Sequence, residues 1–316
     1  MIKGLDFRRL RRWELALAAF ALSAPFLLPA VAPSAPSFIR PAMAEDMQKA
    51  DVSRVVSVGG AITEIIYALG EEGRLVGRDS TSTYPEAAKA LPDVGYMRQL
   101  APEGIIAANP SAIIAVEGSG PPEALAVLKE ANIAFTSVPE AFDKAGIPAK
   151  IRAVGTFLGV EEKAETLAKS VEADLDAAVS ENAARPEAER KRVLFILSTQ
   201  GGKVMASGQG TAANGIIELS GAINAVGTFP GYKALTDEAI IEAKPDVVLM
   251  MDRGGEHSAE ADELFALPAL SLTPAAKNKA LIRMDGLHLL GFGPRTASAV
   301  RELNAAIYGK KANASQ

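Results

Sequence analysis

The chain has 316 residues, contains no cysteine and carries a formal net charge of −5 at pH 7. This length allows two domains of ordinary size, and a hydrophobic content of 48% indicates a globular chain rather than a disordered one. The lack of cysteine excludes disulfides, thiolate metal sites and a lipid anchor attached through cysteine. The acidic balance argues against nucleic acid or an anionic membrane surface as a partner.

The first 44 residues have the layout of a secretory signal peptide. A basic start precedes an apolar run from Leu15 to Val31, and Ala42-Met43-Ala44 forms a small-x-small cleavage site. No later stretch has the roughly 18 consecutive apolar residues that span a bilayer. We therefore expect cleavage and release into the periplasm, by the general secretory or the twin-arginine route. Cleavage removes six of the 33 basic and two of the 38 acidic residues, which leaves a net charge of −9.

Eight short apolar runs predict strands in parallel sheets. They are rich in Val and Ile and apolar on both faces, as strands covered by helices on both sides are. Helical patterns lie between them, for example over Thr63–Leu69, Glu123–Ala131 and Gly215–Leu219, so the alternation predicts an α/β fold. The predicted strands are Arg54–Val58, Leu75–Gly77, Ala112–Val116, Ile133–Val138, Arg192–Leu197, Val204–Ala206, Asp246–Met251 and Ala280–Met284.

Two segments, residues 100–116 and 235–251, repeat one pattern. Each combines a short helix, an x-Pro stop and an apolar strand, and each is followed by a loop that contains glycine. We interpret the repeat as two similar Rossmann-like lobes, residues 45–145 and 189–312, followed by a tail over 313–316. The alternative is that helix–Pro–strand is simply a common device of α/β proteins.

The segment between the lobes, residues 146–188, has no strand pattern after position 160. Leu167, Val171, Leu175 and Val179 recur every three or four residues, which predicts one long helix over about 160–184. A single stiff helix between two α/β lobes allows only small lobe movements.

Ligand-binding residues are expected in the loops at the carboxyl ends of the strands. These loops hold no catalytic set: the only histidines are His257 and His288, and neither lies in a recognisable motif. The pattern Gly208-Gln-Gly210 is not followed by the Lys-Ser/Thr of a phosphate-binding loop. A periplasmic enzyme is therefore the least favoured interpretation, and no catalytic residue is predicted.

Tyr84 stands out in the polar loop Arg78-Asp-Ser-Thr-Ser-Thr-Tyr-Pro85. Pro85 biases the preceding residue towards an extended conformation, which turns the Tyr84 ring away from the following helix. A phenolate oxygen is a hard ligand suited to a ferric ion, and a nearby arginine would stabilise it. The alternative is an ordinary loop tyrosine that packs its ring and bonds through its hydroxyl.

Four sequence blocks and two single residues together resemble the periplasmic haemin-binding components of bacterial haem ABC importers, within the wider group that binds siderophores, haem and cobalamin. The resemblance covers nearly all of the mature chain, and the Asp-Ser-Thr-Ser-Thr-Tyr-Pro loop is its most specific part. It implies a class III binding protein with two Rossmann-like lobes joined by one long α-helix. The blocks are residues 54–70, 76–86, 91–96 and 205–211, together with Asn214 and Gly221.

In that family the loop tyrosine is the axial ligand of the haem iron, and Tyr84 occupies its place. The resemblance thus implies ferric haem b as the transported ligand, with a permease and its ATPase as partners and an outer-membrane haem receptor upstream. We favour a five-coordinate iron that has no protein ligand on its other face, with Arg253 near the Tyr84 side. The alternative is that His288 is a second iron ligand. One haem and a stacked pair both stay open.

Further side chains are candidates for contact with haem or permease. The cations Arg78, Lys233 and Arg253 and the hydroxyls of Ser80, Thr83 and Thr211 are candidates for the propionates. Gly60, Met97, Met205 and Tyr232 are candidates for the porphyrin, and Glu123, Glu256 and Glu260 for permease docking. The main rival ligands are a ferric siderophore, which would need more cations, and cobalamin, which would need more aromatic residues than this chain has outside its leader.

Overall fold

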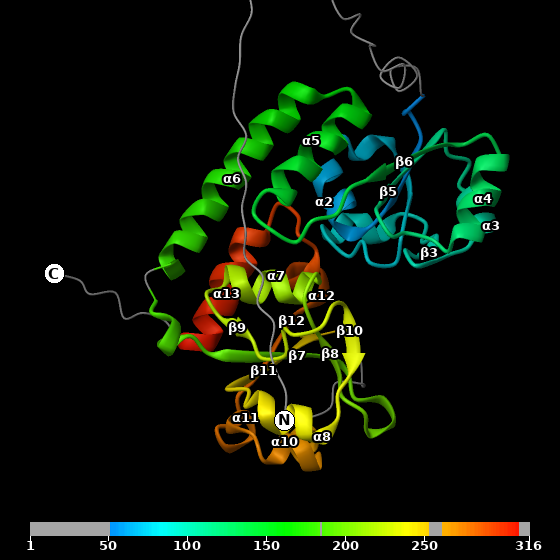
Figure 1. The fold of residues 1–316 in the computed structure, drawn as a ribbon. Helices are drawn as coiled ribbons and strands as arrows, with labels where there is room; N and C mark the ends of the chain where they lie inside the picture. Colours follow the sequence, from blue (N-terminus) through cyan, green and yellow to red (C-terminus); the bar gives the residue numbers. More distant parts are fainter. Residues whose placement is uncertain (1–50, 184, 253–260, 310–316) are drawn as a thin grey trace, which may run out of the picture. The chain divides into compact units, whose positions relative to one another are not determined.

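The computed structural model describes residues 51–183, 185–252 and 261–309 (Figure 1). The predicted leader over 1–44 and the tail over 313–316 lie outside these ranges. Within them, no helix is both long and apolar enough to cross a membrane.

The first lobe is built on a four-stranded parallel sheet in the order β2-β1-β5-β6. A two-stranded antiparallel hairpin, β3 (Gly95–Tyr96) and β4 (Gln99–Leu100), lies apart from it. The sheet strands are β1 (Val55–Val58), β2 (Leu75–Arg78), β5 (Ala112–Val116) and β6 (Ala134–Val138), and the helices are α2 (Gly60–Ala68), α3 (Pro102–Ala107), α4 (Pro122–Glu130) and α5 (Gly146–Leu158). All four predicted strands of this lobe are confirmed to within a residue at either end.

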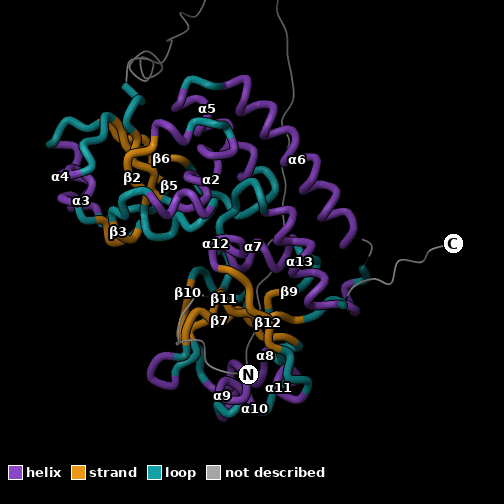
Figure 2. The backbone as a smooth tube through the Cα atoms, turned by 180° about the vertical axis from the view of Figure 1, so that it is seen from behind, coloured by secondary structure: helices purple, strands orange, loops and turns teal. Residues whose placement is uncertain are grey.

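Helices cover both faces of this sheet, as the apolar strands require (Figure 2). Val55 and Ile114 pack with the buried isoleucines of α2 and α5. Their neighbours Val56 and Ile113 point to the other face, where they pack with α3 and α4. Because successive side chains of a strand alternate between faces, strands apolar at every position need two helical layers.

The second lobe has a six-stranded sheet in the order β10-β8-β7-β11-β12, with β9 paired to β7. Its strands are β7 (Arg192–Ser198), β8 (Met205–Ser207), β9 (Ile223–Asn224), β10 (Tyr232–Ala234), β11 (Val247–Asp252) and β12 (Leu281–Asp285). Its helices are α7 (Ala212–Leu219), α8 (Asp237–Ala243), α9 (Ala261–Phe265), α10 (Pro268–Ser271), α11 (Pro274–Lys277), α12 (Gly286–Leu290) and α13 (Thr296–Tyr308). Short 3-10 turns link several elements of both lobes.

The prediction of parallel strands was wrong at one edge of this sheet. The run predicted over 204–206 forms β8, which pairs antiparallel with both β7 and β10. Only a short loop separates β7 from β8, and so short a link suits a hairpin, whereas a parallel partner needs a long crossover.

The internal repeat is visible in the structure. Each copy runs from a short helix, α3 or α8, into a central strand, β5 or β11. Asn109 and Lys244, each directly before the proline, take matching left-handed conformations with φ of 48° and 44°. Both copies end the helix at a left-handed residue before proline and enter the sheet at equivalent positions. The two lobes therefore contain the same helix–strand unit.

One long helix joins the lobes, as predicted, and it is preceded by a helix of the first lobe. The expected long helix is α6 (Glu161–Ala183), and α5 comes directly before it and packs along it. The chain reverses at Gly159, which has a φ of 69°. At the crossing, a Cβ on Gly155 would lie 2.1 Å from the Ala164 Cβ, so only glycine allows this close packing.

One hydrophobic core runs through both lobes. It joins buried residues of α2 and α5 in the first lobe to those of α7, α12 and α13 in the second. Phe142 of the first lobe meets Phe292 of the second edge to face, with ring centroids 5.3 Å apart. The backbones of the two lobes approach closely at Gly215 of α7, where a Cβ would lie 2.2 Å from the Phe142 carbonyl oxygen.

Candidate functional site

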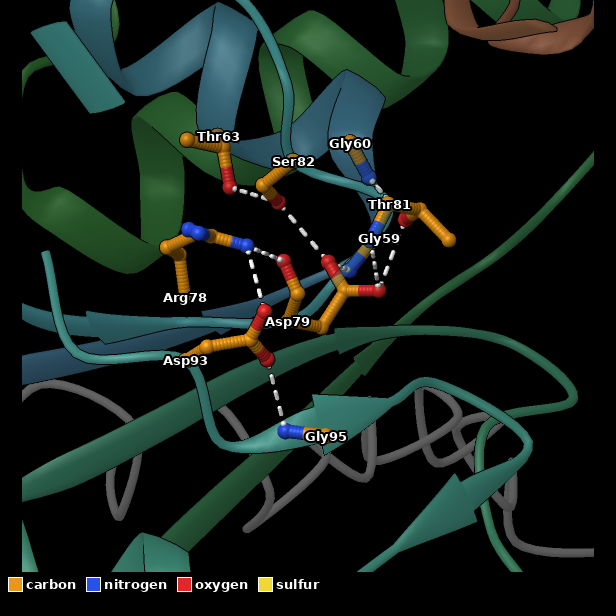
Figure 3. Close-up of polar contacts among 9 residues, drawn as sticks. All are labelled: Gly59, Gly60, Thr63, Arg78, Asp79, Thr81, Ser82, Asp93 and Gly95. Carbon is orange, nitrogen blue, oxygen red and sulfur yellow. Dashed lines mark hydrogen bonds and ion pairs between the residues drawn. The ribbon is translucent and has the colours of Figure 1, made fainter. Parts of the chain in front are cut away.

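The loop after β2, residues 79–84, is folded around one buried carboxylate (Figure 3). Asp79 Oδ1 accepts hydrogen bonds from the Gly59 backbone N–H and the Ser82 hydroxyl, and its Oδ2 accepts from the N–H and hydroxyl of Thr81. Asp79 is completely buried, so these four donors replace its hydration. The hydroxyl-rich sequence of the loop is therefore needed for its folding.

The same loop is tied to helix α2. The Thr63 and Ser82 hydroxyls lie 2.7 Å apart, and the Gly60 N–H donates to the Thr81 hydroxyl at 3.1 Å. These bonds give Tyr84, the last residue before Pro85, a well-supported backbone. The Tyr84–Pro85 peptide is cis.

Tyr84 is 43% exposed, so its side chain is outside the packed core. It lines a pocket of about 340 Å³ between the two lobes. The pocket is lined by Thr83, Tyr84 and Lys89 from the first lobe and by Asp285, His288, Arg295 and Glu302 from the second. The structure thus brings together three of the predicted residues, namely Tyr84, Thr83 and His288.

Arg295 is the main residue that the sequence analysis missed. Its guanidinium carbon lies 3.6 Å from the centroid of the Tyr84 ring, which places a positive charge against one face of the phenol. The same side chain forms an ion pair with Glu64 of α2, at 2.9 Å. Its position in Gly293-Pro294-Arg295, just before α13, carries no recognisable signal, because such turns begin many helices.

His288 does not point a free nitrogen at Tyr84. Its Nε2 is 3.2 Å from a Glu302 carboxylate oxygen, and its Nδ1 is 3.4 Å from an Arg295 guanidinium nitrogen. Because arginine only donates hydrogen bonds, Nδ1 acts as the acceptor and Nε2 carries the proton. Both nitrogens have partners, which disfavours His288 as an iron ligand in this conformation.

A second exposed tyrosine of interest is Tyr232 on β10. Tyr232 is 41% exposed, and it pairs with Ser207 of the neighbouring strand β8. Burial raises the pKa of this phenol, and the positive charge of Arg98 partly offsets the rise. Arg98 belongs to the β3–β4 hairpin of the first lobe and donates to the Tyr96 hydroxyl at 2.9 Å. Tyr96 is itself 42% exposed, and the charge of Arg98 acts electrostatically on Tyr232 of the other lobe.

Several predicted contact residues have other partners in the structure. Arg78 donates to Asp93 at 2.8 Å and to the backbone carbonyl of Asp79, and its side chain is only 12% exposed. Gly60 is buried, and a Cβ there would lie 2.4 Å from a Leu287 methyl group of the other lobe. These contacts favour structural roles for Arg78 and Gly60; their predicted ligand contacts stay predictions.

The other predicted residues are placed as follows. Met97 and Met205 are partly buried, and Met97 packs against the cores of the first lobe. Thr211 is buried and caps α7 by accepting from the Asn214 N–H. Ser80 and Lys233 are exposed, and the Lys233 ammonium lies 5.8 Å from the centroid of the Phe229 ring.

The three permease-docking candidates cannot all be placed. Glu123 is exposed in the first turn of α4. Glu256 and Glu260 lie outside the described residues, and so does Arg253, the cation predicted near Tyr84. Among the residues that the structure does describe, no group of three or more His, Asp or Glu side chains could hold a bare metal ion.

Comparisons with known proteins agree with this two-lobed arrangement. A family model described as periplasmic binding protein matches residues 55–286. The solved structure of the periplasmic heme-binding protein BhuT in complex with two hemes has a TM-score of 0.76 and 40% identity, over 80% of this chain and 97% of that one. The apo structure of the periplasmic heme-binding protein RhuT from Roseiflexus sp. RS-1 has a TM-score of 0.77 and 38% identity, over 81% and 98%.

Among sequences, the uncharacterized ABC transporter substrate-binding lipoprotein YvrC of Bacillus subtilis (strain 168) is 29% identical over 262 residues, which is 82% of this chain and 81% of that protein. The family match spans most of the chain, and the similarity to BhuT covers almost all of that structure. Two α/β lobes with a helical connection are the architecture of class III binding proteins. The chain therefore belongs to the periplasmic binding protein family.

Proposed function

We propose that this protein captures ferric haem b in the periplasm, with the Tyr84 phenolate as the axial iron ligand, and delivers it to an ABC importer. One observation carries the proposal: an exposed tyrosine, held by a buried hydrogen-bond network, faces the space between the lobes with an arginine against its ring. The haem-binding proteins BhuT and RhuT support the choice of ligand because both are similar to this chain along almost their entire length.

The chemistry of the pocket suits an anionic oxygen ligand. A ferric porphyrin needs one donor along its axis, and a phenolate is a hard oxygen donor. Arg295 places positive charge beside the ring that would carry the negative oxygen. Burial of the porphyrin faces at about 25 cal/mol per Å² would supply most of the affinity, while the iron–oxygen bond would set the orientation.

Arg98, Tyr96 and Tyr232 are candidates for a second set of ligand contacts. Arg98 is exposed and donates to the Tyr96 hydroxyl, so its charge is a candidate partner for a haem propionate. The exposed rings of Tyr96 and Tyr232 are suited to contact with a flat aromatic ligand. Arg98 therefore joins Lys233 and Arg253 as a candidate propionate partner, and it is better placed for this than Arg78.

Delivery requires a transient complex with the permease. An acidic group on each lobe, meeting arginines of the permease, would steer this encounter. Glu123 is the exposed candidate on the first lobe, and Glu256 and Glu260 are the candidates on the second. The outer-membrane receptor is an expectation drawn from the resemblance alone.

Titration of the purified mature chain with haemin tests the proposal. We expect a tyrosinate-type ferric haem absorbance spectrum that saturates at one or two haems per chain and disappears in Tyr84→Ala. Tyr67→Phe is the matched control, since Tyr67 is a partly exposed tyrosine of α2 in the same lobe, and it should bind like the wild type. Saturable binding of a ferric siderophore or cobalamin without a haem spectrum would replace haem as the ligand.

A further inference from the structure

Arg295 is held from the opposite lobe at two points. The two oxygens of the Glu64 carboxylate accept hydrogen bonds from the Arg295 backbone N–H at 3.2 Å and from its guanidinium at 2.9 Å. These residues are 231 positions apart in the sequence, on α2 of the first lobe and just before α13 of the second. Glu64 thus fixes both the main chain and the side chain of Arg295.

The burial of Glu64 makes this contact strong and specific. Its side chain is only 6% exposed, and a buried carboxylate must be compensated by a nearby cation or by hydrogen-bond donors. Arg295 provides both. One carboxylate oxygen anchors the Arg295 main chain and the other accepts a charge-assisted hydrogen bond from one guanidinium nitrogen, so the two bonds together restrict where the guanidinium lies. This arrangement places the guanidinium over the Tyr84 ring.

Helix α2 supports the Tyr84 site in two ways. Thr63 binds the Ser82 hydroxyl and so holds the loop that carries Tyr84, while the next residue, Glu64, holds the arginine that covers the Tyr84 ring. Arg295 belongs to the second lobe, yet Glu64 and Tyr84 both belong to the first. Separation of the lobes at this point would therefore break the contacts of Arg295 with both residues together.

We propose that Glu64 is a positioning residue for ligand capture: it holds the Arg295 guanidinium against Tyr84 across the two lobes, and this bridge sets the rate at which bound haem is released. The inference rests on the proposed haem function and deepens it. Glu64 does not touch the ligand; it acts through Arg295 on the Tyr84 phenolate. Loosening of this ion pair would then withdraw the Arg295 charge from the phenolate and weaken its bond to the iron.

The test measures haem release into an excess of apomyoglobin and records the ferric haem spectrum of each variant. Glu64→Gln keeps the size of the side chain but removes its charge and one acceptor. A charge-assisted hydrogen bond of ordinary strength predicts release that is at least about tenfold faster, together with a shifted spectrum. Arg295→Gln should behave alike, and the double variant should release haem no faster than Arg295→Gln alone, because Glu64 acts only through Arg295.

Glu71→Gln is the matched control. Glu71 is a part-buried, ion-paired glutamate of the first lobe that contacts Arg74 and Lys163. Its loss should lower stability without changing haem release. Should Glu64→Gln fail to fold, Glu64→Asp carries the same expectation of faster release, because its shorter side chain cannot reach both donors.

The outcomes separate the two proposals. Wild-type haem binding with unchanged release in Glu64→Gln, or an effect of Glu64→Gln that persists in the Arg295→Gln background, would overturn the positioning role alone. Absence of haem binding by the wild type would overturn the haem function and, with it, the inference.

Discussion

Lys150 is a fully buried lysine at the junction of the two lobes. It lies on α5 with 1% of its surface exposed, and its ammonium is 2.6 Å from a Glu140 carboxylate oxygen. It also donates to the backbone carbonyls of Phe292, at 3.0 Å, and Gly291, at 3.5 Å, both in the second lobe. Burial lowers the pKa of Lys150 and raises the pKa of Glu140, so each charge is stabilised mainly by the other.

We predict that Lys150→Met destabilises the protein by about 3–5 kcal/mol at pH 7, because it leaves the Glu140 carboxylate buried without its cation. In the double variant Lys150→Met/Glu140→Gln, no charge is left uncompensated. The residual cost is then mainly the Phe292 carbonyl oxygen without a donor, about 1–3 kcal/mol. The double variant should therefore be more stable than Lys150→Met alone.

The same change should make stability depend on pH in a definite direction. Burial already raises the pKa of Glu140 in the folded protein, and the positive charge of Lys150 is the largest effect that lowers it. Without Lys150 the folded state binds the Glu140 proton more tightly. A group with a raised pKa in the folded state adds stability at low pH and loses it as pH rises through that pKa. The cost of Lys150→Met should therefore shrink between pH 7 and pH 5.

Urea unfolding followed by circular dichroism at both pH values measures these differences. Glu71→Gln, which breaks a less buried ion pair, serves as the control and should cost less than Lys150→Met. A cost below about 1 kcal/mol for Lys150→Met, or a cost that grows as the pH falls, would refute the reasoning.

Three other changes test separate contacts. Asp79→Asn replaces one carboxylate oxygen, which accepts two hydrogen bonds, with an amide group that donates, so at least one loop donor loses its partner. We expect the free energy of unfolding in urea to fall by about 1–3 kcal/mol. Haem binding in a haemin titration should also be weaker. Gly215→Ala places a methyl group against the Phe142 carbonyl oxygen and should cost about 1–3 kcal/mol, seen as a lower melting temperature; an unchanged melting temperature would contradict the close approach of the lobes. His288→Ala should leave the ferric haem spectrum unchanged, whereas loss of a low-spin spectrum would make His288 an iron ligand.

The sequence alone determined the α/β class, the eight main strands and the long helix α6. These features are local: buried parallel strands are apolar at every position, helices repeat their apolar residues every three or four positions, and both patterns can be read within one segment. The repeat over residues 100–116 and 235–251 could be detected for the same reason, since each copy is a continuous segment. The Tyr84 loop could also be found, because its hydroxyl-rich sequence and Tyr-Pro step are contiguous.

Other features were decided only by the tertiary structure. The antiparallel pairing of β8 depends on which strand becomes its neighbour, and the separate helix α5 depends on packing against α6 and the first lobe. Arg295 and Glu64 meet only because two distant segments of the chain are folded against each other, and the charge of Arg98 acts on Tyr232 for the same reason. Local patterns record which face of an element is buried, but they do not record what that face packs against, so contacts between the lobes had to come from the fold itself.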